Sequence, residues 1–265
     1  MTSAVAPSQR IAAAFSSHGK RAALMPYLMG GFPDMDGSRA AGEACADAAA
    51  DLVELGMPFS DPLADGPTVH EAASRALAAG ATVDGVLEVC AALSQRLPVV
   101  LMVYANAVLA HGGDAAGFAE RAAGAGASGL IVPDLPHDES ALTRAACDAH
   151  GLALVPLVAP NTAPERLEAI GAQARGFVYT VSLAGTTGER TELPPDLPAT
   201  VERVRAATDV PVAVGFGIST PEQARAVGDI ADGVIVGSRV VRAAGEGGPE
   251  AVRALVGELA AALSD

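Results

Sequence analysis

The stretch Asp51-Leu-Val-Glu-Leu-Gly-Met-Pro-Phe-Ser-Asp-Pro-Leu-Ala-Asp-Gly-Pro-Thr68 begins as a short apolar run and breaks into an acidic loop. Glu54 lies near the end of the run, and Asp61 and Asp65 lie in the loop. A carboxylate in an apolar strand is costly to bury unless it is paired or functional. In parallel α/β proteins the chemistry lies where strands end and loops begin. We therefore interpret Glu54 and Asp65 as a functional pair. The alternative is a Glu that reaches solvent and aspartates that form turns.

The same alternation of apolar run and helical segment continues on both sides of this stretch. Each short Val/Ile/Leu run is followed by a helix, the pattern of parallel βα units with both sheet faces covered. Besides the run that contains Glu54, the expected strands are 22–28, 98–104, 128–132, 152–157, 176–181, 210–214 and 232–236. The expected helices between and after them are 36–50, 82–96, 114–124, 138–149, 163–172, 196–207, 220–227 and 247–263.

Eight such units in 265 residues indicate a closed barrel, because one (β/α)8 barrel commonly needs about 250 residues. Helical patterns at 8–19 and 69–79 precede the first strand and interrupt a loop. The expected fold is therefore α/β: a (β/α)8 TIM barrel with a short N-terminal helix and extra helices in the βα loops. No linker or low-complexity tract divides the chain, so residues 1–265 are expected to form a single domain.

Composition narrows the functional classes. A net charge of -14 argues against binding to nucleic acid or anionic membranes, which both require a basic surface. The three cysteines, Cys45, Cys90 and Cys147, are widely separated, which disfavours a zinc site or a disulfide framework and suggests small buried residues on helices. There is no signal-peptide pattern and no apolar run of about 20 residues. We expect a soluble protein of a reducing compartment, the cytoplasm.

Polar residues at the expected strand ends define the candidate chemistry. They are rich in carboxylates and include none of the five histidines and no lysine, so a metal site or a Schiff-base mechanism is disfavoured. The set consists of Tyr27, Glu54, Asp61, Asp65, Tyr104, Asn106, Asp134 and Tyr179.

Glycines follow the last two expected strands. Gly215-Phe-Gly217 and Gly237-Ser238 each precede a helix start, where backbone N–H groups and the helix dipole can hold a phosphate. Barrels of this type often bind phosphate there, although glycines can also simply form tight turns. The loop 182–192 is longer than an ordinary βα connection and suits a mobile lid, with disorder without function as the alternative.

Five segments, in order, closely resemble the tryptophan synthase alpha subunit family over nearly the whole chain. The most specific is the fourteen-residue signature from Glu54 to Pro67. The others are Tyr104-Ala-Asn106, Pro133-Asp-Leu-Pro136, Gly185-Thr-Thr-Gly188 and Gly215-Phe-Gly-Ile-Ser219. The resemblance implies retro-aldol cleavage of indole-3-glycerol phosphate to indole and glyceraldehyde 3-phosphate.

The resemblance also implies residue roles. Glu54 would be the general acid/base, with its pKa raised by apolar walls, and Asp65 would stay ionised and accept the indole N–H. Tyr179 matches the family tyrosine that packs near Glu54, and Thr187 the lid residue that meets the catalytic Asp. The implied phosphate contacts are Gly188, Gly217, Gly237 and Ser238, and the implied indole contacts are Tyr27, Val69, Met102, Ile131 and Phe216.

A partner is implied as well. Asp61, Asn106 and Pro136 match the face that contacts the beta subunit, with an alpha2beta2 assembly expected. Indole would pass through a tunnel to this partner, which carries pyridoxal phosphate (PLP), and no cofactor is expected in the present chain. Phe32 stands where many members carry Asp, and Leu183 where some members have Arg in the lid. These departures bear on coupling to the partner and not on the two acids.

Three other functions remain open at this point. The first is a stand-alone indole-3-glycerol phosphate lyase that releases free indole. The second is an alpha-like scaffold that only regulates a beta subunit, which the two intact acids argue against. The third is another phosphate-binding barrel, such as a sugar-phosphate epimerase or isomerase, which the missing strand-end His and Lys argue against.

Overall fold

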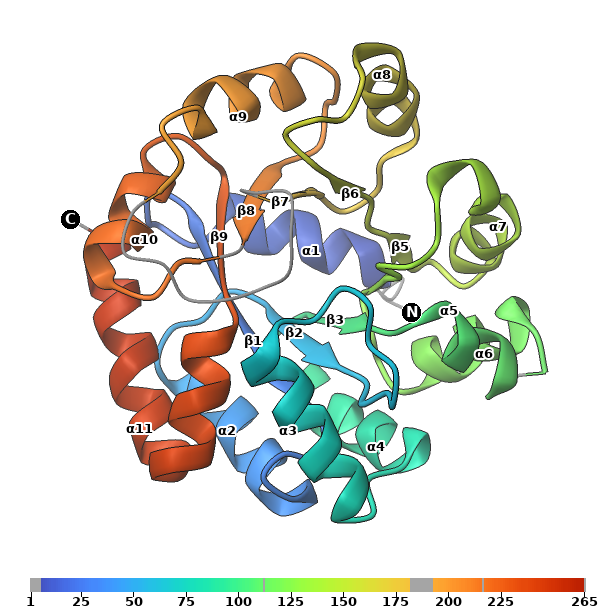
Figure 1. Ribbon diagram of the computed structural model, residues 1–265, viewed down its shortest axis with the longest axis vertical. Coiled ribbons are helices and arrows are strands. Elements are labelled where there is room, and N and C mark those ends of the chain that lie inside the picture. Colours follow the sequence, from blue (N-terminus) through green and yellow to red (C-terminus); the bar gives the residue numbers. More distant parts are fainter. Residues whose placement is uncertain (1–5, 112, 182–192, 216, 265) are drawn as a thin grey trace, which may run out of the picture.

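The computed structural model describes residues 6–111, 113–181, 193–215 and 217–264. All the strand pairs are parallel, and the strands form one sheet in the order β5-β4-β3-β2-β1-β9-β8-β7-β6 (Figure 1). The strands are β1 Ala23–Met29, β2 Val53–Gly56, β3 Val99–Met102, β4 Gly129–Ile131, β5 Ala153–Leu154, β6 Leu157–Val158, β7 Val178–Val181, β8 Val212–Gly215 and β9 Gly233–Val236.

The two ends of this sheet are halves of one barrel strand. Between β5 and β6, the Val155 N–H donates to the Leu130 carbonyl (2.9 Å) on the side of β4, and the Pro156 carbonyl accepts from the Tyr179 N–H (2.9 Å) on the side of β7. Pro156 has no N–H to continue the ladder. The single strand expected at 152–157 is therefore broken, while the predicted eight-position barrel is confirmed.

Helices surround the strands (Figure 1). They are α1 Pro7–Ser16, α2 Met35–Asp47, α3 Pro67–Ala78, α4 Val83–Ser94, α5 Ala105–Ala110, α6 Ala115–Gly124, α7 Ala141–Ala149, α8 Pro164–Gln173, α9 Leu197–Arg205, α10 Pro221–Gly228 and α11 Ser238–Ser264, with a 3-10 turn η1 His137–Glu139. The extra helices α1 and α3 were predicted, whereas α5 and η1 were not. The predicted final helix, 247–263, also began too late: α11 starts at Ser238 and is interrupted at Gly248 (φ 62°).

Side-chain caps explain several helix starts. The side chains of Asp34, Thr82 and Asp114 each accept a hydrogen bond from the N–H group three residues ahead. Thr220 does the same and forms a reciprocal capping box with Gln223. Such caps satisfy N–H groups that have no partner inside the helix, so the chain enters each helix at a defined residue.

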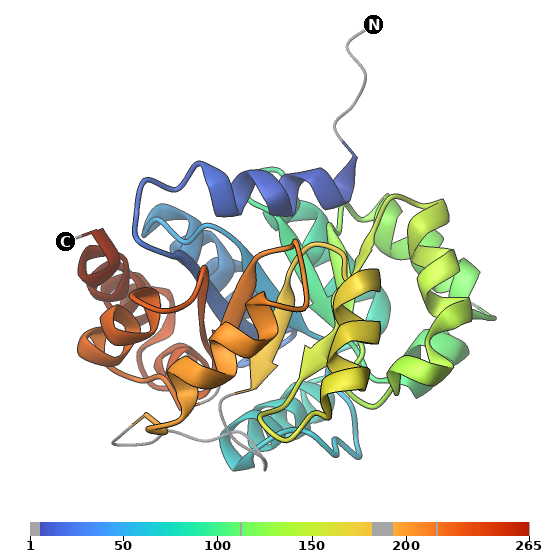
Figure 2. The ribbon, with the colours of Figure 1, turned by 90° about the horizontal axis from the view of Figure 1, so that it is seen from above.

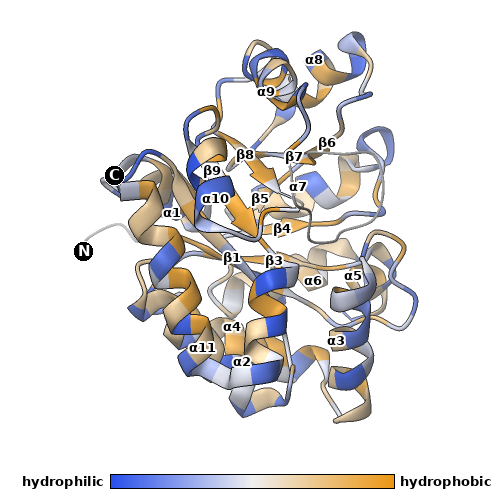
Figure 3. Cartoon of the chain, turned by 60° about the vertical axis from the view of Figure 1, so that its left-hand side comes forward, coloured by the Kyte–Doolittle hydropathy of each residue, from blue (hydrophilic) through white to orange (hydrophobic). Residues whose placement is uncertain are grey.

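The apolar residues form an outer layer between strands and helices and an inner cluster within the barrel. Figure 3 shows the hydrophobic strands at the centre and mixed helices around them. The helix α1 lies across one end of the strands (Figure 2). It buries Ile11 in the inner cluster and places Phe15 against Phe177, with ring centroids 5.6 Å apart. This end of the barrel is therefore closed, and any site must lie at the other end.

A buried ion pair lies close to β2. The Lys20 ammonium contacts both carboxylate oxygens of Asp51, at 2.9 and 2.8 Å, and the second oxygen also accepts from the Leu24 N–H at 2.7 Å. The two side chains are only 7% and 11% exposed. Each charge is thus compensated, which is what burial of an ion pair requires.

The cysteine prediction is confirmed. Cys45, Cys90 and Cys147 are free and buried, on α2, α4 and α7. In the described ranges no single helix is long and apolar enough to cross a membrane. The pair α3 and α4 would together be long and apolar enough, but the two helices are bent by 111° relative to each other.

Candidate active site

Glu54 lies on β2, in register with Tyr27 of β1. It is 0% exposed, and within the described part of the chain neither carboxyl oxygen has a hydrogen-bond partner. Burial raises its pKa to about 8, because the charged form loses its hydration without compensation. The carboxyl is therefore mainly protonated at neutral pH. The alternative of a Glu that reaches solvent is wrong.

Asp65 lies in the loop that follows β2 and is partly buried. Burial raises its pKa to about 6, while a hydrogen bond from the Tyr104 hydroxyl and the positive charge of His70 act in the opposite direction. The same hydroxyl accepts from the Ala64 N–H at 3.1 Å, which fixes the loop against the strand end. At pH 7 the two acids are consequently in opposite states: Asp65 is ionised and Glu54 is mainly neutral.

Two buried tyrosines flank the acids. Burial, followed by the negative charges of Glu54 and Asp65, raises the pKa of Tyr27 and of Tyr179 well above the usual value, so both hydroxyls stay neutral donors. Glycines make room for them. A Cβ atom on Gly56 would lie 2.1 Å from the Tyr27 hydroxyl oxygen, and one on Gly215 would lie 2.3 Å from that of Tyr179. The sequence analysis did not anticipate these two close approaches.

One cavity holds both acids at the open end of the barrel. Its lining comprises Tyr27, Glu54, Ala64, Asp65, Val69, Met102, Pro133, Leu157, Tyr179, Gly217, Ile218, Ile235, Gly237 and Ser238. Nine of these were singled out from the sequence. Ile131 was expected here but is not among the lining residues, whereas Ile235 lines the cavity although it was not predicted; both belong to the inner barrel cluster. Ile235 lies on β9 two residues before Gly237, so the two residues share one face of the extended chain. This spacing is the signal that could have identified Ile235.

The glycine-rich side of the cavity has the geometry of an anion site. Gly217 has a positive φ of 81°, which favours glycine, and α11 begins at Ser238. The Gly237 carbonyl accepts from the N–H groups of Val240 and Val241, so the N–H groups before them belong to the open first turn. Arg239 is partly exposed on that turn and was not predicted, although it directly follows Gly237-Ser238.

Several predicted residues lie elsewhere. Asp61, Asn106 and Pro136 are exposed, and the exposed apolar side chains of Leu63 and Leu109 occur in the same two segments as Asp61 and Asn106. The predicted residues Thr187, Gly188 and Phe216, together with Leu183 and the loop 182–192, are outside the described residues.

Phe32, one of the two family departures, is buried. Its ring lies 4.8 Å from the Arg75 guanidinium carbon and fills the space beside Gly245. Within the described ranges, no three His, Cys, Asp or Glu side chains form a group that could hold a metal ion.

Known proteins resemble this chain both in sequence and in fold. The profile of the family described as tryptophan synthase alpha chain matches residues 14–262. The tryptophan synthase alpha chain of Carboxydothermus hydrogenoformans is 49% identical over 227 residues, 85% of this chain and 84% of that protein. That of Gloeobacter violaceus is 46% identical over 253 residues, 94% and 91% of the two chains. A structure of Mycobacterium tuberculosis tryptophan synthase superposes with a TM-score of 0.90 at 42% identity, covering 97% of this chain and 98% of that one.

Proposed function

We propose residue roles for this chain, which belongs to the tryptophan synthase alpha chain family. The family cleaves indole-3-glycerol phosphate to indole and glyceraldehyde 3-phosphate, a carbon–carbon lyase half-reaction of tryptophan biosynthesis. The single observation that carries the assignment of roles is Glu54, a fully buried carboxyl without a described partner, in one cavity with the ionised Asp65.

Glu54 serves first as an acid and then as a base. Its protonated carboxyl delivers a proton to indole C3, which leaves the ring system positively charged. The resulting carboxylate takes the proton of the hydroxyl on the adjacent side-chain carbon. The carbon–carbon bond then breaks, its electrons return to the ring, and the side chain leaves as an aldehyde. Glu54 ends protonated, as it began. A pKa of about 8 suits both halves of this cycle near neutral pH.

Asp65 stabilises the charge that this protonation creates. Its carboxylate accepts the indole N–H, and the interaction strengthens as the ring becomes positive. A pKa of about 6 keeps it ionised at neutral pH, and the Tyr104 hydroxyl holds it in place. Tyr27, Val69, Met102 and Tyr179 supply walls for the indole ring.

The substrate phosphate is assigned to the open first turn of α11. Gly217, Gly237 and Ser238 line this part of the cavity. Backbone N–H groups and the helix dipole are sufficient to bind a phosphate dianion. Thr187, Gly188 and Phe216 are proposed to complete the site from the undescribed segments.

Two variants test these roles. Glu54→Gln should lower the rate of indole release by about 10²- to 10⁴-fold, and Asp65→Asn by about 10²- to 10³-fold. Glycerol 3-phosphate should bind both variants as it binds the wild type, because neither acid lies at the phosphate end. Preserved turnover in either variant would remove that acid from the mechanism.

Members of this family work with a beta subunit. For this chain we assign the contact to the face that carries Asp61, Asn106 and Pro136, in an alpha2beta2 assembly. PLP would reside in the partner and no cofactor in this chain. The three free, buried cysteines support a reducing compartment such as the cytoplasm.

The deciding measurement is indole release by the purified chain, alone and with a beta subunit. Slow release alone and strong activation by the partner would support coupled function. Fast release that does not respond to the partner would identify a stand-alone lyase. No release in either case would leave only a regulatory scaffold.

A further inference from the structure

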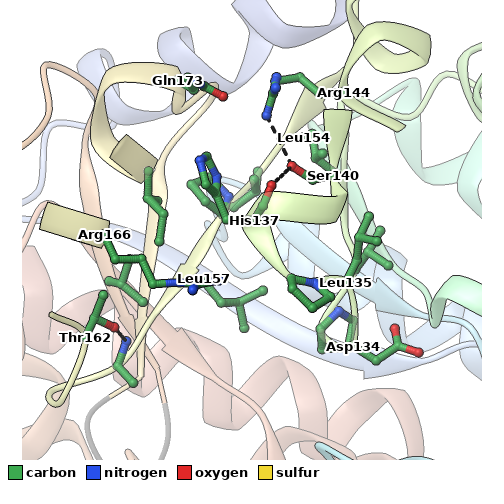
Figure 4. A pocket seen from close by; sticks show the side chains of 18 of the residues that line it. Asp134, Leu135, His137, Ser140, Arg144, Leu154, Leu157, Thr162, Arg166 and Gln173 are labelled. Carbon is green, nitrogen blue, oxygen red and sulfur yellow. Dashed lines mark hydrogen bonds between the residues drawn. The ribbon is translucent and has the colours of Figure 1, made fainter. Parts of the chain in front are cut away.

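A second cavity, of about 480 Å³, opens on the side of the barrel between α7 and α8 (Figure 4). It lies at the broken strand: β5, Pro156 and β6 form its back, and the segment that follows β4 and the helix α8 form its sides. The helix α7 packs mainly against α6 and β5. The volume is within the range of small-molecule sites, roughly 300–1,000 Å³.

The back and sides of this cavity are apolar. They are formed by Val132, Pro133, Leu135, Leu154, Leu157 and Ile170. The titratable groups that line it are Asp134, His137, Arg144 and Arg166. Figure 4 shows Arg144, His137 and Arg166 around the hollow, with Asp134 at its edge.

The two guanidinium groups differ in their partners. Arg166 pairs with Asp138 at 3.1 Å and is thereby neutralised. Arg144 is partly buried and donates to the Ser140 hydroxyl at 3.1 Å, and that hydroxyl in turn donates to the His137 carbonyl at 2.7 Å. Within the described residues, no carboxylate forms an ion pair with Arg144. Asp134, which also lines the cavity, accepts from the Ala105 N–H at 2.8 Å. The cavity therefore presents one guanidinium with spare donors above an apolar floor.

This combination selects a ligand class. A guanidinium offers several donors in a planar fork that matches a carboxylate, and partial burial strengthens the contact. The Asp134 carboxylate, which lines the cavity, and the Asp138 carboxylate, which pairs with Arg166, make a dianion less favourable here than a monoanion. We propose that this cavity binds a small apolar monocarboxylate, with its carboxylate on Arg144 and its apolar body against Leu154, Leu157 and Ile170.

The proposed site is separate from the active site but shares a wall with it. Pro133 and Leu157 line both cavities. The two acids and the glycines of the phosphate end line only the first cavity, whereas Arg144 lines only the second. Ligand binding there can thus be measured without any turnover of the lyase, and the failure of one proposal leaves the other intact.

The test is calorimetric titration of the full chain with 3-phenylpropionate and with its neutral counterpart 3-phenylpropionamide. We expect the carboxylate to bind at least ten times more tightly than the amide. Arg144→Gln should remove this preference. Arg39→Gln should retain it, because Arg39 is exposed on α2 and pairs with Glu43 at 3.0 Å, away from the cavity.

A second variant tests the apolar floor. Leu154 lines only this cavity, so Leu154→Phe should fill part of it and weaken binding of 3-phenylpropionate at least tenfold while indole release persists. Equal affinities for acid and amide, unchanged binding in Arg144→Gln, or no binding up to 10 mM would each overturn the proposal.

Discussion

Asp51 and Glu54 belong to the same short segment, and both are largely removed from water, but their surroundings are opposite. Asp51 receives hydrogen bonds from the Lys20 ammonium and the Leu24 N–H. Glu54 has no such partner among the described residues. A partner allows a buried carboxylate to stay charged and contribute to stability, whereas the lack of one shifts the pKa and leaves the proton available for chemistry.

The difference follows the architecture of the barrel. One end is closed by α1 and its neighbouring segments, and there the buried charges of Lys20 and Asp51 are paired. The other end is open, and there the acids face a cavity. Barrels of this type separate stability and catalysis between their two ends in the same way.

The largest expected effect is on the pH dependence of stability. The folded-state pKa of Glu54, about 8, is above its ordinary value, so the native protein holds a proton that the unfolded chain releases. Stability is therefore lost as the pH rises from about 4.5 to about 8. Relative to Glu54→Gln, the wild type should lose up to about 5 kcal/mol across this window. Urea unfolding of both proteins at several pH values measures it, and a pH-independent difference would contradict the assignment.

Asp51→Asn should have the next largest effect on stability. Here the wild-type carboxylate stabilises the fold, whereas the Glu54 carboxyl destabilises it at high pH. The amide would leave the Lys20 charge buried and uncompensated, which costs about 3–5 kcal/mol. Urea unfolding at pH 7 measures the loss. Indole release per folded molecule should stay within about twofold of wild type, because Asp51 does not line the cavity. A destabilisation below about 1 kcal/mol would show that the pair contributes little.

Gly56→Ala should have an intermediate effect at the open end. The new methyl group would collide with the Tyr27 hydroxyl, since the positions are 2.1 Å apart. Overpacking of this kind costs about 1–3 kcal/mol, and the displaced ring should also slow indole release. Gly257→Ala in α11 is the matched control, because no atom lies within 4 Å of its added Cβ. Equal stabilities of the two variants, measured by thermal unfolding, would exclude the clash.

Tyr104→Phe should have the smallest effect. The hydroxyl donates to the charged form of Asp65 and so lowers its pKa. Its removal should raise that pKa by about 1 unit. The acidic limb of the pH–rate profile should then move to higher pH while the rate near pH 8 changes little. If the acidic limb does not move, the ionisation that produces it belongs to a group other than Asp65.

Local pattern was sufficient for the barrel and for most of the cavity lining. The alternation of apolar runs and helices predicted the eight positions, and strand-end placement brought Tyr27, Glu54 and Tyr179 together. The break at Pro156 could be recognised only from the hydrogen bonds on both sides of it. The short helix α5 was missed because six residues give little periodicity.

Contacts across the barrel were outside the reach of sequence reasoning. Apolar composition alone did not separate Ile131 from Ile235, and only the spacing of Ile235 from Gly237 favours it as a lining residue. The same limit applies to Gly56 and Gly215, because their need for glycine comes from a tyrosine on a neighbouring strand.

The helix α1 has a consequence for the order of events during synthesis. It is synthesised before the residues against which it packs: Ile11 contacts the segment around Ala153 and Phe177, and Phe15 lies beside Gly233. At about 5–20 residues per second, Phe177 follows α1 by roughly 10–30 s. During that interval the side chains of Ile11 and Phe15 have no docking surface. This end of the barrel therefore cannot close until the segments around Phe177 and Gly233 have been made.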